Sequence, residues 1–198
     1  MERDEPPTPD FPRVVEIGWR NDDSLSLDAF NEGLTVQFSD KMEEATGSLD
    51  TFVVTVEIPD SLPGVEGRVR WIGHRPFIVY GGIRTDGEVW IFRPCPSLPR
   101  ELLADWLGQE VKLISDTREC VQKITGKDVN IDNPRIRVRV ELKGDAILSK
   151  EKQIPLDGDV IGKVDLNANI PVTDLVLPSG DGVTGGAFES WFYLDTKS

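Results

Sequence analysis

Three aspartates in two glycine-rich turns are the best candidates in this sequence for binding a metal ion. Asp157 and Asp159 flank Gly158, and Asp181 lies in a second turn, residues 177–182. Carboxylate oxygens are the hard ligands that Ca²⁺ prefers, but the twelve-residue loop with a terminal glutamate that marks an EF-hand is absent. Aspartates in turns commonly accept hydrogen bonds from their own backbone. Two interpretations therefore stand: a calcium site built from Asp157, Asp159 and Asp181, or three turn-forming aspartates.

Catalytic constellations are absent from the sequence. His74 is the single histidine, and residues 73–76 have the composition of a turn between two strands. Ser179 lacks the flanking pattern of a nucleophile elbow, and its neighbouring glycines favour a tight turn with positive φ. A pair of carboxylates for glycoside hydrolysis cannot be judged from sequence distance. We therefore expect no catalytic residues and no enzyme.

The two cysteines, Cys95 and Cys120, do not have metal-binding spacing. Neither belongs to a Cys-x-x-Cys motif or has a histidine close by in the sequence, which argues against zinc. They would form a bridge between two loops in an oxidising compartment, whereas a chain kept in the cytoplasm would hold both reduced. We expect the reduced state.

The net charge of the chain argues against partners with a negative surface, such as nucleic acids and anionic membranes. The chain has 22 basic and 35 acidic residues among 198, for a net charge of −13, and such a field repels phosphate backbones and anionic membrane surfaces. Arg135, Arg137 and Arg139 form a local exception. Their spacing of two places them on one face of a strand, where they either pair with acidic neighbours or meet an acidic partner. We expect the pairing with neighbours, and no nucleic-acid binding.

The secondary structure around these residues is predicted to consist of β-strands. Apolar and polar residues alternate with a period of two in most of the chain, which is typical of half-buried strands. Asp86 and Gly87 provide a hairpin signal between two of them. The pattern predicts an all-β, antiparallel sandwich with strands at residues 13–19, 34–38, 52–58, 67–72, 77–80, 88–92, 111–114, 136–142 and 187–194.

One short helix is expected at residues 99–107, where Leu102, Leu103, Trp106 and Leu107 share a face before Gly108 ends it. The polar segment 116–133 carries no clear pattern, and its length suggests a functional loop. The last strand, 187–194, has aromatic residues on both faces. Such residues either lie under a neighbouring loop or form a contact patch.

The first twelve residues are acidic and proline-rich, which predicts a disordered segment, 1–12, before a single domain, 13–198. They contain no apolar stretch of the kind that a secretory signal needs. No run approaches the roughly 18 apolar residues of a membrane-spanning helix, so no membrane insertion is expected. We expect synthesis in the cytoplasm, with any release or display by a specialised route.

A family resemblance rests on two phrases. Residues 36–42, Val-Gln-Phe-Ser-Asp-Lys-Met, followed by the strand at 52–58, resemble the bacterial immunoglobulin-like domains of surface-layer and adhesion proteins. Residues 140–147, running on to 156–158, resemble the closing strand and hairpin of those domains. The resemblance covers residues 13–160 and implies an immunoglobulin-like sandwich, to which the helix near Leu102 and a C-terminal strand extension are additions. It implies no catalytic residues.

Two functions follow as expectations. The first is a non-enzymatic structural or protein–protein interaction module within a larger assembly, such as a phage-tail-like or contractile injection particle, with Trp90, Trp191 and Tyr193 as contact anchors. The second is a carbohydrate-binding or adhesive module, with Trp71, Trp90 and Trp191 as stacking faces and calcium as a stabilising ion.

Overall fold

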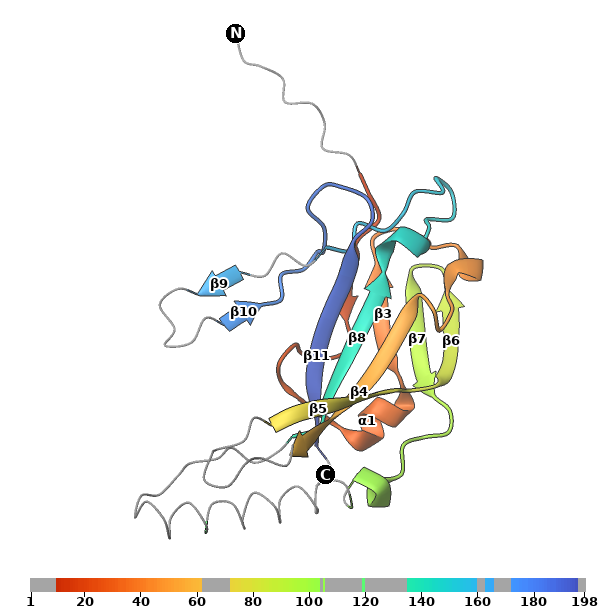
Figure 1. The fold of residues 1–198 in the computed structure, drawn as a ribbon. Helices are drawn as coiled ribbons and strands as arrows, with labels where there is room; N and C mark the ends of the chain where they lie inside the picture. The colour runs from red at the N-terminus through yellow and green to blue at the C-terminus, as the bar shows by residue number, and fades with distance from the viewer. Residues whose placement is uncertain are drawn as a thin grey trace.

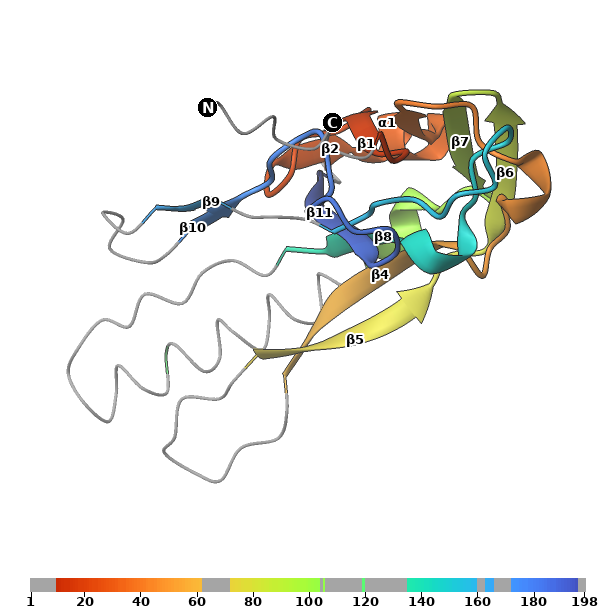
Figure 2. The ribbon, with the colours of Figure 1, turned by 90° about the horizontal axis from the view of Figure 1, so that it is seen from above.

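The computed structural model describes residues 10–61, 72–103, 105, 119, 135–159, 163–165 and 172–195, with residues 59–61, 72–74, 163–165 and 172–174 described by backbone alone. The described chain folds as an all-β sandwich of two packed sheets, as the period-two pattern predicts (Figure 1). Seen from above, the sheets form two separate layers (Figure 2).

The smaller sheet has four strands in the order β1-β3-β7-β6, namely β1 (Val14–Ile17), β3 (Leu34–Phe38), β7 (Val89–Pro94) and β6 (Gly81–Asp86). The larger sheet has five in the order β2-β11-β8-β4-β5, namely β2 (Ser24–Ser26), β11 (Ala187–Asp195), β8 (Arg137–Lys143), β4 (Phe52–Ser61) and β5 (Ile72–Ile78). All neighbours in these two sheets are antiparallel except β2 and β11. A separate two-stranded ribbon pairs β9 (Lys163–Asp165) with β10 (Val172–Asp174).

The core lies between the two sheets and is built from alternate residues of their strands. In β3, Leu34, Val36 and Phe38 are buried while Thr35 and Gln37 between them are half-buried. Buried side chains of β4, β8 and β11 face them from the other layer. Because successive side chains in a strand point to opposite faces, this alternation is what a sheet with one covered face requires.

The C-terminal strand is an interior strand of the larger sheet. β11 pairs with β8 over seven residue pairs, from Ala187 opposite Lys143 to Tyr193 opposite Arg137. On its other side it pairs with β2, from Tyr193 opposite Ser24 to Asp195 opposite Ser26. The run expected at 187–194 is therefore confirmed as a strand, and it lies inside the sheet instead of extending it at an edge.

Helical structure is limited to short segments. The expected helix at 99–107 is helical at its described residues 100–103 and 105. A helix that the pattern does not predict, α1 (Leu27–Glu32), begins after Ser26, whose hydroxyl accepts a hydrogen bond from the Ala29 N–H. Two 3₁₀ turns, η1 (Glu44–Thr46) and η2 (Gly144–Ala146), and the single described helical residue Glu119 complete the list among the described residues. No helix in the described part of the chain is long and apolar enough to span a membrane.

The turn expected at residues 73–76 is wrong, because these residues belong to β5 and pair with β4. Gly73 and Pro76 resemble turn residues, yet an edge strand tolerates both, since only one side of its backbone forms a ladder. The expected strand at 111–114 and the segment 116–133, apart from Glu119, lie outside the described residues, as do Trp71, Cys120 and residues 1–9.

Two of the three arginines, Arg137 and Arg139, follow the expected pairing with acidic neighbours, whereas Arg135 lies over the Tyr193 ring. Ile136, Val138 and Val140 are fully buried on the opposite face of the same segment. Arg137 and Arg139 both form ion pairs with Glu57 of β4, a side chain that is 9% exposed. Arg139 also pairs with Glu189 of β11 at 3.7 Å. These arginines therefore serve the sheet's own cross-strand contacts.

Trp90 cannot be a contact anchor, which corrects the expectation from sequence. Its side chain is fully buried in the core and meets the Phe38 ring in a T-shaped contact, with centroids 5.1 Å apart. Trp90 lies opposite Val36 in the register, so its ring points to the covered face of the smaller sheet. The alternation at 88–92 fixes two faces of a strand but does not say which of them is covered.

This placement predicts that Trp90→Ala lowers the free energy of unfolding by about 3–5 kcal/mol, the usual cost of truncating a buried aromatic side chain. Trp191→Ala, at a half-buried position, should cost much less. Urea unfolding followed by circular dichroism measures both variants. Equal losses in the two variants would contradict the burial of Trp90.

Candidate functional site

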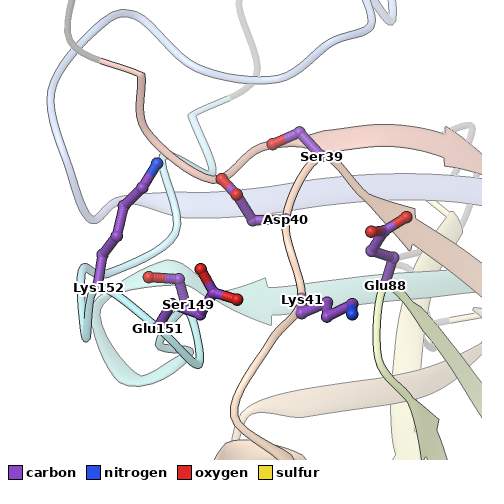
Figure 3. A pocket seen from close by; sticks show the side chains of 7 residues that line it. All are labelled: Ser39, Asp40, Lys41, Glu88, Ser149, Glu151 and Lys152. Carbon is purple, nitrogen blue, oxygen red and sulfur yellow. The ribbon is translucent and has the colours of Figure 1, made fainter.

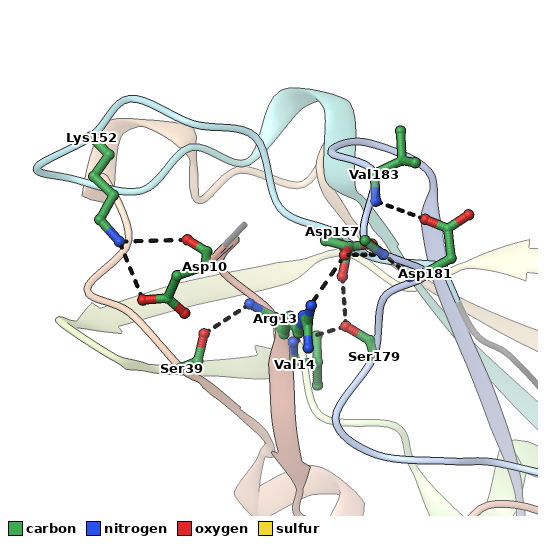
Figure 4. Close-up of polar contacts among 10 residues, drawn as sticks. Asp10, Arg13, Val14, Ser39, Lys152, Asp157, Ser179, Asp181 and Val183 are labelled. Atoms are coloured by element: carbon green, nitrogen blue, oxygen red, sulfur yellow. Dashed lines mark hydrogen bonds and ion pairs between the residues drawn. The ribbon is translucent and has the colours of Figure 1, made fainter. Parts of the chain in front are cut away.

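Asp157 lies at the meeting point of three chain segments (Figure 4). Its carboxylate is fully buried and lies 3.7 Å from the Arg13 guanidinium (Oδ2 to Nε). Oδ1 accepts a hydrogen bond from the Asp181 N–H at 3.1 Å, and Oδ2 accepts one from the Gly182 N–H at 2.9 Å. A buried carboxylate is costly unless it is paired in this way. Asp157 therefore ties the turn at 180–182 to the N-terminal strand.

Ser179 completes the junction between these segments. Its hydroxyl donates to the Asp157 carbonyl at 2.7 Å and accepts from the Val14 N–H at 2.9 Å. Its own N–H donates to the Val14 carbonyl at 2.8 Å. The Ser179 side chain is almost completely buried. The geometry thus gives this hydroxyl a structural role, and it closes the outer edge of β1.

Glycine is required beside the buried carboxylate. Gly180 has φ +106°, and a Cβ at this position would overlap the Asp157 carboxylate. Gly182 has φ +90° and turns its N–H toward the same carboxylate. A side chain at either position would meet a backbone conformation that other residues rarely adopt. The glycines of the second turn therefore let the backbone wrap closely around Asp157.

The expected aspartate trio does come together. One carboxylate oxygen from each of Asp157, Asp159 and Asp181 lies within 4.8 Å of the other two. Both oxygens of Asp157 already accept backbone hydrogen bonds, and Arg13 supplies a positive charge beside it. Asp181 accepts a hydrogen bond from the Val183 N–H at 2.9 Å. These contacts fit the turn-forming alternative, and a cation would have to compete with Arg13 for Asp157.

We predict that Asp157→Asn lowers the free energy of unfolding by about 1–3 kcal/mol, because the amide leaves one part-buried backbone N–H without an acceptor and removes the charge opposite Arg13. Asp159→Asn is the matched control and should change stability by no more than about 0.5 kcal/mol. Thermal and urea unfolding measure both.

A calcium titration separates the two interpretations of the trio. If the aspartates only form turns, millimolar calcium leaves the unfolding midpoint of the wild type unchanged. A rise in the midpoint that disappears in both Asp157→Asn and Asp181→Asn would identify a metal site instead, because binding to the folded state alone stabilises it.

A small polar pocket lies near this junction and is lined by Ser39, Asp40, Lys41, Glu88, Ser149, Glu151 and Lys152 (Figure 3). Its volume is about 160 Å³. The Ser149 hydroxyl accepts from the Ile154 N–H, and the Lys152 ammonium contacts both the carbonyl and the carboxylate of Asp10. The lining mixes both signs of charge and contains neither histidine nor cysteine.

The outer face of the larger sheet brings together residues that lie far apart in the sequence. Residues that pair directly across strands share a face, so the register defines two rows. One row is Trp191, Arg139, Thr55 and Ile78, and the next is Tyr193, Arg137, Glu57 and Pro76. We call these two rows the outer-face rows. Trp191 and Tyr193, expected as contact anchors, are thus neighbours on the face turned away from the core.

Trp191 and Tyr193 are both half-buried and each contacts a described neighbour. The Trp191 indole N–H donates to Asp22 at 3.1 Å. The Arg135 guanidinium lies 3.6 Å above the centre of the Tyr193 ring, a cation–π arrangement. Each aromatic ring is therefore held in place while part of its surface stays accessible.

Apolar side chains are exposed where the chain passes from β5 to β6. Ile78 is 60% exposed, Tyr80 70% and Phe77 44%. They border a hollow of about 390 Å³, whose other lining residues are Val56, Val79, Cys95, Pro96, Ser97, Leu98, Pro99 and Leu102. The sequence pattern does not predict this hollow, because it favours a turn at residues 73–76, where the structure has the strand β5. Tyr80 and Cys95 meet where β6 pairs with β7, since the Cys95 N–H donates to the Tyr80 carbonyl at 2.9 Å, and Leu98 is held by two hydrogen bonds to Asn31 of α1.

Searches against protein-family models, curated proteins and solved structures gave no match for this chain.

Proposed function

We propose that this β-sandwich is a non-enzymatic protein–protein interaction module, and that its contact surface is the outer face of the larger sheet. The observation that carries this proposal is the composition of the outer-face rows. Trp, Tyr and Arg are the residue types that dominate interface energies, and here Trp191, Tyr193 and two arginines lie side by side in register.

Exposure supports the same surface at its β5 end only. Ile78 ends one of the outer-face rows and is 60% exposed. Glu57 and Thr55, at the middle of the rows, are nearly covered. Aromatic and aliphatic groups at the two ends of the rows supply the apolar area that an interface core needs, and the charges between them are already paired. Because Arg137 and Arg139 already pair with Glu57, a partner would use their apolar stems more than their charges.

The larger context is a proposal as well. The resemblance of residues 36–42 and 140–147 to bacterial immunoglobulin-like domains favours a subunit of an assembly, such as a phage-tail-like or contractile injection particle. Mild affinity purification of this chain from its source cells, with mass measurement of the native complex, tests this context. Recovery in a defined complex supports a subunit role, and recovery as a lone monomer opposes it.

The carbohydrate-binding alternative is weakened by the position of Trp90. Stacking on a sugar ring needs accessible aromatic faces, and Trp90 has none. Trp191 offers only part of its ring, and Trp71 lies outside the described residues.

For the interaction module we predict that Trp191→Ala weakens binding to the recovered partner by about 2 kcal/mol or more, as for a central anchor. Isothermal titration calorimetry with the purified partner measures the change. Arg84→Ala is the control, because its side chain is 74% exposed on the smaller sheet. Binding that survives Trp191→Ala with the fold intact would exclude Trp191 as an anchor.

A further inference from the structure

We propose that the outer edge of β5 binds an extended polypeptide segment, which adds to the five-stranded sheet as a further strand. The inference rests on the proposed function, because it names the mode by which that partner binds. Among the described strands, β5 is an edge of its sheet and pairs with β4 alone. Strand addition of this kind uses main-chain hydrogen bonds for affinity and side-chain pockets for selection.

The register shows which backbone groups face outward. The Val79 N–H donates to the Val54 carbonyl at 2.8 Å, so these two residues form a hydrogen-bonded pair. In an antiparallel ladder such pairs alternate with pairs that exchange no hydrogen bond. Ile78, opposite Thr55, and Pro76, opposite Glu57, therefore belong to the second kind. Ile78 directs its N–H and carbonyl away from β4, and Pro76 directs only its carbonyl there.

The other edges are less suited to a partner. Ser179 closes β1 by exchanging hydrogen bonds with both backbone groups of Val14. β2 is only three residues long. β6 carries the exposed charges of Arg84 and Asp86, 74% and 79% exposed, and charged side chains discourage strand pairing. Among the described edge strands, β5 is the best candidate, because it is seven residues long and carries the exposed apolar side chain of Ile78.

The side chains around this edge indicate what an added strand would carry. Ile78 and Tyr80 lie on or beside the edge with most of their surface exposed. The hollow of about 390 Å³ at the carboxyl end of β5 has a mainly aliphatic and aromatic lining. It would take an apolar residue of the incoming strand. The net charge of −13 favours a segment whose remaining residues are basic.

Pro76 sets the selectivity of the edge. Its ring removes one outward donor in the middle of β5, and proline on an edge strand is a known guard against indiscriminate pairing. A segment that binds here can donate to the Pro76 carbonyl but must place its own acceptors against N–H groups on either side of Pro76. This edge is selective instead of generally adhesive.

Three variants test the edge without touching the β4 ladder. Ile78→Pro removes the outward N–H and should weaken binding about tenfold or more. Ile78→Ala is the reference for this variant, because it also loses the exposed side chain but keeps that N–H, so the further loss in Ile78→Pro reports the main-chain hydrogen bond. Pro76→Ala restores the missing donor and should tighten binding about threefold to tenfold.

The probe is a phage-displayed library of random peptides selected on the full chain, with the affinity of each enriched peptide measured by fluorescence polarisation. We expect peptides of alternating apolar and basic residues that bind Ile78→Pro at least about tenfold more weakly than Ile78→Ala and bind Pro76→Ala more tightly than the wild type. Enrichment of no peptide, or equal affinity for Ile78→Ala and Ile78→Pro, overturns the inference. If Ile78→Pro does not fold, Pro76→Ala decides, and unchanged affinity overturns it.

The same measurements separate failure of this mode from failure of the proposed function. A peptide that is lost with Trp191→Ala but binds Ile78→Pro normally overturns strand addition and leaves the outer face as the contact surface. Recovery of the chain from its source cells as a lone monomer counts against the proposed function itself.

Discussion

The pleat of the larger sheet constrains every surface described above. One face of β4, β8 and β11 must supply the core, so Val54, Val140 and Ser190 are directed inward and their sequence neighbours outward. The outward residues then fall into rows that no local pattern reveals, because each row takes members from four strands. Trp191 and Ile78 belong to one row for this reason alone. A one-residue slip of β11 against β8 would exchange the two faces and lose both the core and the outer-face rows.

Local periodicity predicts the strands well wherever the period is regular. The runs at 34–38, 52–58, 136–142 and 187–194 all correspond to strands, because each alternates and has one covered face. β6 escapes prediction, since Gly81, Gly82 and Arg84 offer no apolar alternation and the strand depends on its pairing with β7. α1 is too short for a helical stripe, and only Ser26 and Gly33 mark its two ends. Tertiary pairing decides these elements.

The contacts around Asp157 show which parts of a site can be predicted from the sequence. The two Gly–Asp turns are visible in the sequence, and Asp157, Asp159 and Asp181 do gather. The sequence cannot show that Arg13 lies beside Asp157, or that Ser179 joins Val14 to the same residue, because these contacts cross most of the chain. They also change the chemistry, since a carboxylate that already holds backbone donors and a guanidinium is a poor cation ligand. The same holds for Trp90. Whether an aromatic side chain lies in the core or on a contact surface depends on what packs against its face of the strand, and that is decided by tertiary structure.

The place of β11 in the sheet has a consequence for biosynthesis. Ser190 contacts Asn21, 169 positions earlier in the chain, and β11 fills the space between β2 and β8. Until the ribosome has delivered residues 187–195, the apolar faces of β8 and α1 lack one of their covers, and β2 has no neighbour. Contacts of such long sequence separation are slow to form, and an incomplete sheet exposes strand edges that attract other chains. Translation must therefore run almost to the end of this sandwich before its larger sheet closes.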